Sequence, residues 1–413
     1  MTVADHSEHL ASDAAPEAGH RAGSAAYRRV VAALFLAGLA TFALLYSTQA
    51  LLPQLARDFG VTEGASTLTV SLTTIALACT LLLVGPLSDV VGRTRLVHLS
   101  LGLAAAIGLL CAVAPTFTTL LVLRALLGVA LAGLPAVATA YLREELHPGT
   151  QARAAGLYIG GTALGGMAGR LVTAGAADLA GWRWALATTG LLALACAVAV
   201  RLLLPPSRGF VPAPAGVRPA VRMTARALAD PALLSLYAIG ALSMGALVAS
   251  LNTVGFRLEA PPFGLGLGAA SLVFLVYPLG SISSALAGRA ADAVGRHVVP
   301  PVAALVAVAG VVVTLAARLD AVVLGLALLV IGFFAVHGTA SGWVPVRAQE
   351  AGVSAGQAAS LYLVAYYAGA SVFGSLAGLV WSAAGWGGVV AMAAALMTLS
   401  GALAVGLRRG GRP

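Results

Sequence analysis

The chain has 413 residues, of which 60% are hydrophobic and 9% are charged, and its formal net charge is +9. Soluble domains carry about 25% charged residues, so a chain this apolar is expected in a lipid bilayer. All 24 basic residues are arginines, scattered along the chain and mostly outside the apolar stretches, a distribution that does not favour nucleic acid as a partner.

The apolar residues form twelve stretches of about 20 residues, the length that crosses a bilayer as a helix. These stretches cover residues 30–52, 65–87, 96–114, 117–142, 154–176, 183–204, 232–255, 268–287, 298–317, 321–344, 358–382 and 386–407. We therefore expect an all-α membrane protein with two pseudo-symmetric six-helix bundles, at 30–204 and 232–407.

Three polar segments flank or separate the bundles. Residues 1–29 lack the apolar centre of a secretory signal and are predicted to be a disordered tail. Residues 205–231 are rich in proline and arginine and are predicted to be a linker, and 408–413 form a short second tail. With the N-terminus inside, eighteen arginines face the cytoplasm and four face outward. This bias predicts a multi-pass inner (plasma) membrane protein with cytoplasmic tails and linker.

The two bundles are predicted to have arisen by duplication. At an offset of 204 residues, Gly128 corresponds to Gly332 and Arg143 to Arg347, and the register holds without a gap to Gly181-Trp182 and Gly385-Trp386. Six spans per repeat place both repeats in the same orientation, related by an axis along the membrane normal. Two like bundles that can rock about a shared cavity suit a transporter.

A short charged turn occurs once in each repeat, as "GPLSDVVGRTRL" at 85–96 and "GRAADAVGRH" at 288–297. The residues common to the two turns are Gly85, Asp89, Gly92 and Arg93 in the first, and Gly288, Asp292, Gly295 and Arg296 in the second. Glycine permits a tight backbone where a Cβ would clash, and a carboxylate is favoured beside a helix N-terminus. A solvated turn that only marks topology is the alternative.

Residues 27–407 resemble the major facilitator superfamily, because the first turn matches the signature between its helices 2 and 3. "LRALLGVALAG", with Arg124, resembles the superfamily's helix-4 signature, and "GLYIGGTALGGMAGR" and "SLYLVAYYAG" resemble the YnfM-like carriers, grouped with drug- and arabinose-efflux types. The resemblance implies that each turn forms part of a cytoplasmic gate, in which Arg93 pairs across the rim when that side is closed. The second turn departs from the signature at Arg289 and Ala290.

The fifth span carries glycines at a spacing of four, Gly161, Gly165 and Gly169, which share one helix face. Small residues at this spacing let two helices approach closely. We expect a bending or sliding surface between the two halves, with plain tight packing as the alternative. Thr162 and Ala163 stand where the resembling efflux motif has a proline, so this segment does not establish antiport.

Two arginines, Arg124 and Arg170, lie inside predicted spans, where no span has a carboxylate at mid-membrane. Charges at this depth are costly and usually face a cavity or a partner. We therefore place both arginines in the substrate cavity, and hydrogen bonding to helix carbonyls or extension to the interface is the alternative.

His337 is the proton-coupling candidate, because histidine alone titrates near neutral pH and this one is predicted in mid-span. A structural histidine is the alternative. Further polar residues are predicted to line the cavity or to bond between helices: Tyr46, Gln49, Asn252, Tyr362 and Tyr366.

These features predict a monomeric secondary active transporter that works by alternating access and exports a small neutral or anionic organic molecule or drug against proton entry. A cavity selecting cations normally needs a buried carboxylate, which the spans lack. A facilitator or sugar/organic-acid carrier without proton coupling is the alternative, and a non-transporting receptor is a remote one. The sequence shows no catalytic residues, metal ligand set or cofactor motif, so we expect no enzyme.

Overall fold

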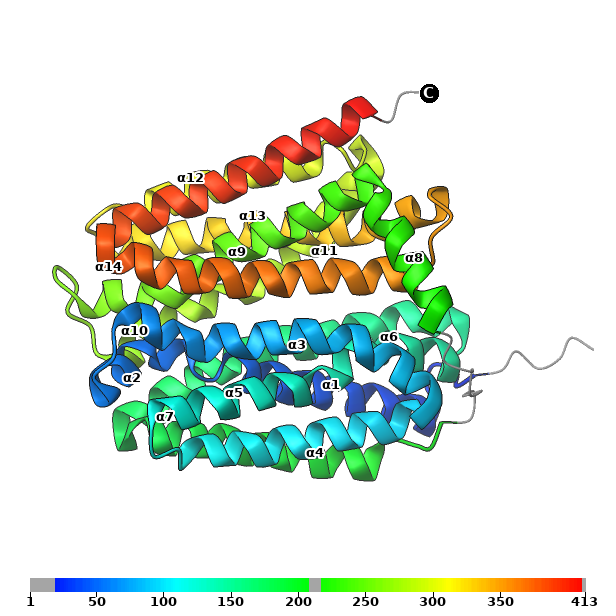
Figure 1. Cartoon of the computed structure of the whole chain (residues 1–413), viewed down its shortest axis with the longest axis horizontal. Coiled ribbons are helices and arrows are strands. Elements are labelled where there is room, and N and C mark those ends of the chain that lie inside the picture. The colour runs from blue at the N-terminus through cyan, green and yellow to red at the C-terminus, as the bar shows by residue number, and fades with distance from the viewer. Residues whose placement is uncertain (1–18, 208–216, 411–413) are drawn as a thin grey trace, which may run out of the picture.

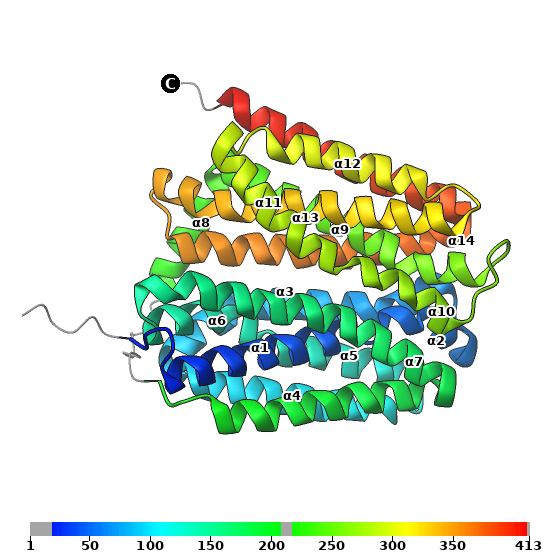
Figure 2. The ribbon, with the colours of Figure 1, turned by 180° about the vertical axis from the view of Figure 1, so that it is seen from behind.

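The computed structural model describes residues 19–207 and 217–410, without the side chains of Pro86, Asp89, 217–221 and 408–410. The described residues are almost entirely helical (Figures 1 and 2). The first half contains α1 (Ala25–Tyr46), η1 (Gln49–Leu51), α2 (Leu52–Phe59), α3 (Glu63–Val91), α4 (Arg93–Ala112), α5 (Phe117–Leu131), α6 (Gly133–Glu145) and α7 (Pro148–Leu203). The second half contains α9 (Pro231–Glu259), α10 (Leu267–Ser271), η2 (Leu272–Val276), α11 (Pro278–Val294), α12 (Val299–Val313), α13 (Leu319–Glu350) and α14 (Ala355–Gly410), and α8 (Val217–Ala229) precedes it.

Within these described ranges, nine helical segments are long and apolar enough to cross a membrane, and α12 is a shorter apolar helix. Two of the nine, α7 and α14, are each interrupted by a glycine with non-helical backbone angles, Gly181 and Gly385. Dividing both helices at these glycines and adding α12 is compatible with the twelve predicted spans. The predicted boundaries at 176–183 and 382–386 enclose both glycines.

The halves lie side by side as two layers of lengthwise helices, with α1–α7 in one layer and α9 and α11–α14 in the other, and the short α10 lies at their boundary near α2 (Figure 1). The backbone repeats between them. Gly92 has φ 98° and ψ 142°, and Gly295 has φ 94° and ψ 140°. L side chains rarely adopt this conformation, which explains the glycine at the same place in both turns.

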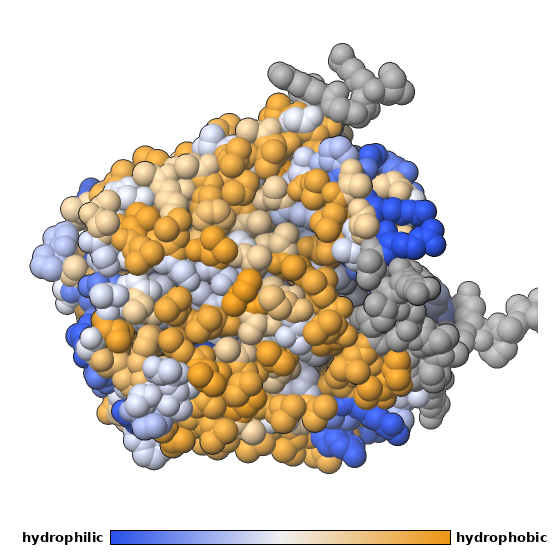
Figure 3. All heavy atoms as spheres, viewed as in Figure 1, coloured by the Kyte–Doolittle hydropathy of each residue, from blue (hydrophilic) through white to orange (hydrophobic). Residues whose placement is uncertain are grey.

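The two ends of the layers differ in what they carry. The terminal end holds α8, the turns that join α3 to α4 and α11 to α12, and the first and last described residues. The far end holds α2, α10 and the interruptions of α7 and α14 (Figure 1). Between the ends the visible surface is mainly apolar, while hydrophilic residues gather toward the ends (Figure 3). This distribution fits a body embedded in lipid.

Part of the predicted disordered tail is ordered, which corrects the boundary at residue 29. Residues 1–18 lie outside the described ranges, but α1 begins at Ala25, where the Ser24 side chain accepts a hydrogen bond from the backbone N–H of Tyr27. The backbone N–H of His20 donates to the carbonyl of Glu145 at 2.9 Å. Capping and this contact hold the segment against the first half.

The linker and the second tail also contain helix that the sequence interpretation left out. Helix α8 occupies much of 205–231, and Gln357 Nε2 on α14 donates to Thr224 Oγ1 on α8 at 2.8 Å. Helix α14 continues to Gly410, into the predicted tail, and 411–413 lie outside the described ranges.

Candidate functional site

The two halves contact each other at the far end through α3 and α14. A Cβ built on Gly378 of α14 would lie 2.5 Å from the Cα of Gly64 on α3 and 3.0 Å from the side chain of Thr67. Nearby, Ser371 Oγ donates to the Ser71 carbonyl at 2.8 Å. Small residues therefore allow the backbones of the two halves to approach closely here. Sequence interpretation missed this interface, although Gly374 and Gly378 show the four-residue spacing.

Two polar contacts reinforce the far-end closure. Arg57 Nη1 on α2 lies 2.6 Å from Glu259 Oε2 on α9, and the Gly268 N–H of α10 donates to Asp178 Oδ2 on α7 at 2.8 Å. Each contact joins one half to the other. The Arg57 side chain is 60% exposed, so its ion pair contributes modestly.

At the terminal end, each half contains an internal ion pair. Arg93 Nη2 lies 2.9 Å from Glu144 Oε1 on α6, and Arg347 Nη2 lies 2.6 Å from Asp230 Oδ2 at the start of α9. Partial burial acts to raise the pKa of Asp230, but hydrogen bonds from Arg347 and the Leu233 N–H outweigh it, and the net shift is downward.

The two turns predicted to form the gate differ in the partners of their charged residues. Arg93 bonds to Glu144 and Ser88 within its own half, and its pairing across the rim stays a prediction. The structure does not describe the side chain of Asp89. Asp292 is exposed, and the second repeat has Ala348 at the position of Glu144, so Arg296 lacks the equivalent carboxylate. Gly85 and Gly288 have open space where a Cβ would stand.

Arg124 is fully buried and its donors are directed to backbone carbonyls. Its Nε donates to the Thr69 carbonyl at 2.8 Å and its Nη2 to the Leu45 carbonyl at 2.7 Å, while Nη1 donates to the Leu44 carbonyl and Ser47 Oγ. Leu44 and Leu45 lie in the last turn of α1, where the helix dipole favours a cation. This geometry corresponds to the carbonyl-bonding alternative, and it replaces the expectation that Arg124 faces a cavity.

Arg170 is equally buried but makes fewer hydrogen bonds. Its Nε donates to Gln49 Oε1 at 2.5 Å and its Nη1 to the Gly166 carbonyl at 2.7 Å. Its guanidinium carbon lies 4.2 Å from the ring centroid of Tyr46 in the first half and 4.8 Å from that of Tyr277 in the second. A cation over several aromatic faces is stabilised by their quadrupoles. Arg170 therefore lies between the halves.

Gln49 connects Arg170 to the second half. Its Nε2 donates to Asn252 Oδ1 at 2.6 Å, and Asn252 Nδ2 donates to the Gly374 carbonyl at 3.3 Å. Gln49 and Asn252 occupy corresponding places in the two repeats, 203 residues apart, as do the two gate turns. The structure thus brings together three predicted cavity residues, Gln49, Arg170 and Asn252, in one hydrogen-bonded chain between the halves.

His337 lies among aromatic rings of the second half. Its Nδ1 is 2.9 Å from Tyr362 Oη, and its ring centroid lies 4.7 Å from Tyr366 and 5.7 Å from Phe333. Phe333 contacts Phe334, which contacts Tyr277 edge-on, so the aromatic rings form a continuous path from His337 toward Arg170. We call the residues on this path, with Gln49 and Asn252, the central cluster. Tyr277, Phe333 and Phe334 were not singled out from the sequence, nor was Phe274, whose ring centroid lies 5.2 Å from the guanidinium carbon of Arg170.

The glycines of the fifth span pack within the first half, which corrects the expected surface between the halves. A Cβ at Gly161, Gly165 or Gly169 would collide with backbone atoms of Phe35, Leu39 and Ala43, all on α1. The tight-packing alternative describes these positions, because the glycine face of α7 points toward α1 and away from the second half.

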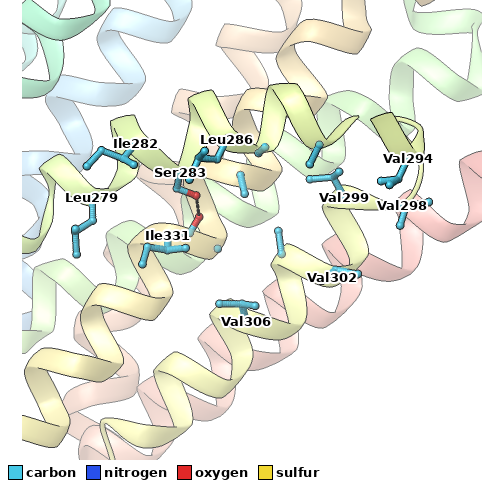
Figure 4. A pocket seen from close by; sticks show the side chains of 15 residues that line it. Leu279, Ile282, Ser283, Leu286, Val294, Val298, Val299, Val302, Val306 and Ile331 are labelled. Atoms are coloured by element: carbon cyan, nitrogen blue, oxygen red, sulfur yellow. Dashed lines mark hydrogen bonds between the residues drawn. The ribbon is translucent and has the colours of Figure 1, made fainter. Parts of the chain in front are cut away.

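A separate pocket of about 490 Å³ lies between α11, α12 and α13 (Figure 4). Its lining is nearly all aliphatic, and its one drawn hydrogen bond runs from Ser283 Oγ to the Ile331 carbonyl at 2.7 Å. No predicted site residue lines it, so it offers no charged group to select a polar solute.

A family model for the Major Facilitator Superfamily matches residues 33–359. The chain belongs to this superfamily. Among its relatives, the uncharacterized MFS-type transporter YybF of Bacillus subtilis is 41% identical over 372 residues, 90% of this chain and 91% of that protein. The inner membrane transport protein YnfM of Escherichia coli is 40% identical over 388 residues, 94% of this chain and 91% of that protein. This superfamily member is thus related to transporters over nearly its whole length.

Solved structures confirm the fold of this major facilitator chain. An inward-facing, unoccupied crystal structure of a bacterial homolog of the human lysosomal transporter Spinster has a TM-score of 0.75 at 15% identity, covering 93% of this chain and 97% of that one. The human organic anion transporter MFSD10 has a TM-score of 0.68 at 19% identity, covering 92% and 99%. At these identities the likeness concerns the fold alone.

Proposed function

We propose that this protein is a secondary active transporter that exports a small neutral or anionic organic molecule in exchange for protons. The observation that supports it most is the combination of a closed far end with a polar cluster between the halves. The contacts of α3 with α14 and of Arg57 with Glu259 join surfaces that belong to different halves. Such contacts can break and reform without unfolding either half.

The membrane orientation follows from the arginine distribution. We place the terminal end in the cytoplasm and the protein in the inner membrane as a monomer, because the predicted spans assign eighteen of the 24 arginines to that side. Far-end closure then corresponds to an inward-facing conformation, from which a cytoplasmic solute could enter. Opening the far end and closing the terminal end would complete the cycle, with the turns at Gly92 and Gly295 acting as the cytoplasmic gate.

His337 is the residue proposed to carry the proton. Protonation turns both ring nitrogens into donors, so Nδ1 would then donate to Tyr362 Oη, and the surrounding rings can stabilise the imidazolium. The spans hold no mid-membrane carboxylate that could serve instead. Binding of a proton would therefore change the contacts of a residue in the central cluster.

The proposal is tested by flux measurements in proteoliposomes with and without a pH gradient, screening metabolites and drugs as solutes. We expect wild-type flux to follow the gradient. His337→Gln should lose this dependence and keep downhill exchange, because glutamine retains hydrogen bonding but does not titrate. Gradient dependence identical to wild type would remove His337 from the coupling role. Wild-type flux indifferent to pH would favour a facilitator or sugar/organic-acid carrier, and a complete lack of flux would favour a receptor.

A further inference from the structure

The guanidinium of Arg170 is a buried cation without a carboxylate partner among the described residues. The residue is 1% exposed, and no carboxylate of the described residues lies within 4.0 Å of it. Within the same described set, Nε and Nη1 have acceptors while Nη2 has none. Arg124 differs, because all three of its nitrogens have acceptors. An uncompensated buried charge is costly, so Arg170 is poised for an anion.

The residue that lies beside the guanidinium is a glycine, Gly166. A Cβ built on Gly166 would lie 3.3 Å from Arg170 Nη1, 3.7 Å from Tyr46 and 3.9 Å from Tyr277. A larger residue at 166 would therefore crowd the cation and both rings. The second repeat has Gly374 at the position of Arg170, so only the first half supplies a cation here.

The neighbours of Arg170 determine the shape of the anion. Tyr46, Phe274 and Tyr277 surround the guanidinium, and the rings of Phe334, Phe333 and His337 continue from Tyr277. Aromatic walls favour a flat apolar body, and a planar guanidinium favours a carboxylate, which it can bind through two hydrogen bonds. An aromatic carboxylate satisfies both requirements.

The same guanidinium also holds the closure between the halves. Arg170 Nε fixes the Gln49 carbonyl oxygen, and this contact orients Gln49 Nε2 toward Asn252 of the other half. A carboxylate is a stronger acceptor than an amide oxygen, so it would displace Gln49 from Nε. A displaced Gln49 would no longer be oriented toward Asn252.

We propose that Arg170 binds the carboxylate of an aromatic cargo in place of the Gln49 amide, and that this exchange releases the Gln49–Asn252 contact and opens the far end. The inference rests on the proposed transport function and specifies its cargo class. A ligand shifts a conformational equilibrium only by its difference in affinity between the states. Here the difference arises because the carboxylate and Gln49 compete for one donor.

Spin-label distances in the full-length protein in lipid nanodiscs test the proposal, after replacement of Cys79, Cys111 and Cys196 by alanine. Asp58→Cys with Ala383→Cys reports on the far end, and Arg95→Cys with Arg289→Cys reports on the terminal end; all four positions are exposed. The probes are benzoate, phenylacetate and cinnamate, each compared with its uncharged primary amide.

In the wild-type protein we expect each carboxylate to lengthen the far-end distance and shorten the terminal-end distance at concentrations where its amide has no effect. The apparent affinity for the carboxylate should exceed that for the amide by about tenfold or more, which corresponds to about 1.4 kcal/mol. Arg170→Gln should abolish this preference. Gly166→Val should weaken carboxylate binding, and Gly160→Val, at an open position on the same helix, should not.

Gln49→Leu separates recognition from closure. It should increase the far-end-open population without any ligand and keep the carboxylate preference, because Arg170 remains. The proposal is overturned if no carboxylate shifts the wild-type distances, or if Arg170→Gln responds to carboxylates as the wild type does.

Flux in proteoliposomes distinguishes this inference from the proposed function. Gradient-driven transport of uncharged solutes only would refute the carboxylate inference and leave secondary transport intact. Carboxylate-dependent distance changes without flux of any solute would support the Arg170 site and refute transport.

Discussion

Two buried arginines and a half-buried histidine illustrate how hydrogen-bonding partners decide the role of a side chain. Arg124 donates hydrogen bonds to carbonyls at the end of α1. Arg170 has one donor without a partner among the described residues, and His337 contacts Tyr362. Their counterparts at an offset of 204 are Leu328, Gly374 and Gly133. Each polar group therefore occurs in one repeat only. The duplicated scaffold supports a site whose chemistry is asymmetric.

Arg124→Leu should destabilise the protein. The substitution leaves buried carbonyls of Thr69, Leu44 and Leu45 without their donor, and each orphaned group costs about 1–3 kcal/mol. Thermal unfolding of the detergent-solubilised protein would measure the loss. Arg170→Gln is the matched control, and we expect a smaller loss because this arginine satisfies fewer acceptors. Equal losses would contradict the distinction between the two arginines.

At the scale of helices, the glycine face of α7 fixes the position of α1. Gly165 lies against the backbone of Leu39, and its counterpart in the second repeat, Gly369, lies against Ala241 of α9. The same packing of a span on the first helix of its own half therefore occurs twice. At one position of the second repeat, the glycine lies on the first helix of the pair and not on the later one. There, Gly245 of α9 leaves room for the side chain of Phe373 on α14.

Gly165→Ala should lower the stability of the first half without trapping one conformation. Its new methyl group would press on the Leu39 carbonyl, and overpacking of this kind costs about 1–3 kcal/mol. Gly160→Ala is the control on the same helix, because no atom lies within 4 Å of its Cβ position. Thermal unfolding of both variants gives the comparison. A stable Gly165→Ala protein held in one conformation would instead favour the sliding surface expected from the sequence.

For the whole molecule, the proposed alternation between conformations depends on the far-end interface. It combines small residues on α3 and α14 with the Arg57–Glu259 pair and the Asp178 contact to α10. The exposed ion pair contributes little by itself, so the close backbone approach at Gly64 and Gly378 is the stronger determinant.

Gly378→Val should shift the protein toward the far-end-open conformation while leaving each half folded. The valine side chain would meet the Gly64 backbone and Thr67 across the interface, so closure becomes unfavourable. The spin-label pair at 58 and 383 should report a longer distance without ligand. Gly387→Val, on α14 with open space around it, serves as the control. An unchanged distance distribution in Gly378→Val would show that this contact does not control closure.

The sequence by itself determined the fold class and the two-repeat plan, because apolar length, arginine bias and a long register are properties of a chain in a bilayer. It also located the turn glycines, Gly92 and Gly295, whose backbone angles only glycine adopts readily. Gln49, Arg170, Asn252 and His337 were identified as candidate residues on the same grounds, since buried polar groups stand out in apolar spans.

Only the tertiary structure decided which partner each of these residues meets. The sequence places Arg124 and Arg170 inside predicted spans, but whether a guanidinium meets carbonyls or aromatic rings depends on the neighbouring helices. The glycines of α7 likewise mark a close approach without naming the approaching helix, which is α1. The far-end interface and the Gln49–Asn252 bond require the relative placement of two halves. Contacts between segments about 200 residues apart leave no local periodicity in the chain, so they emerge only when the helices are packed.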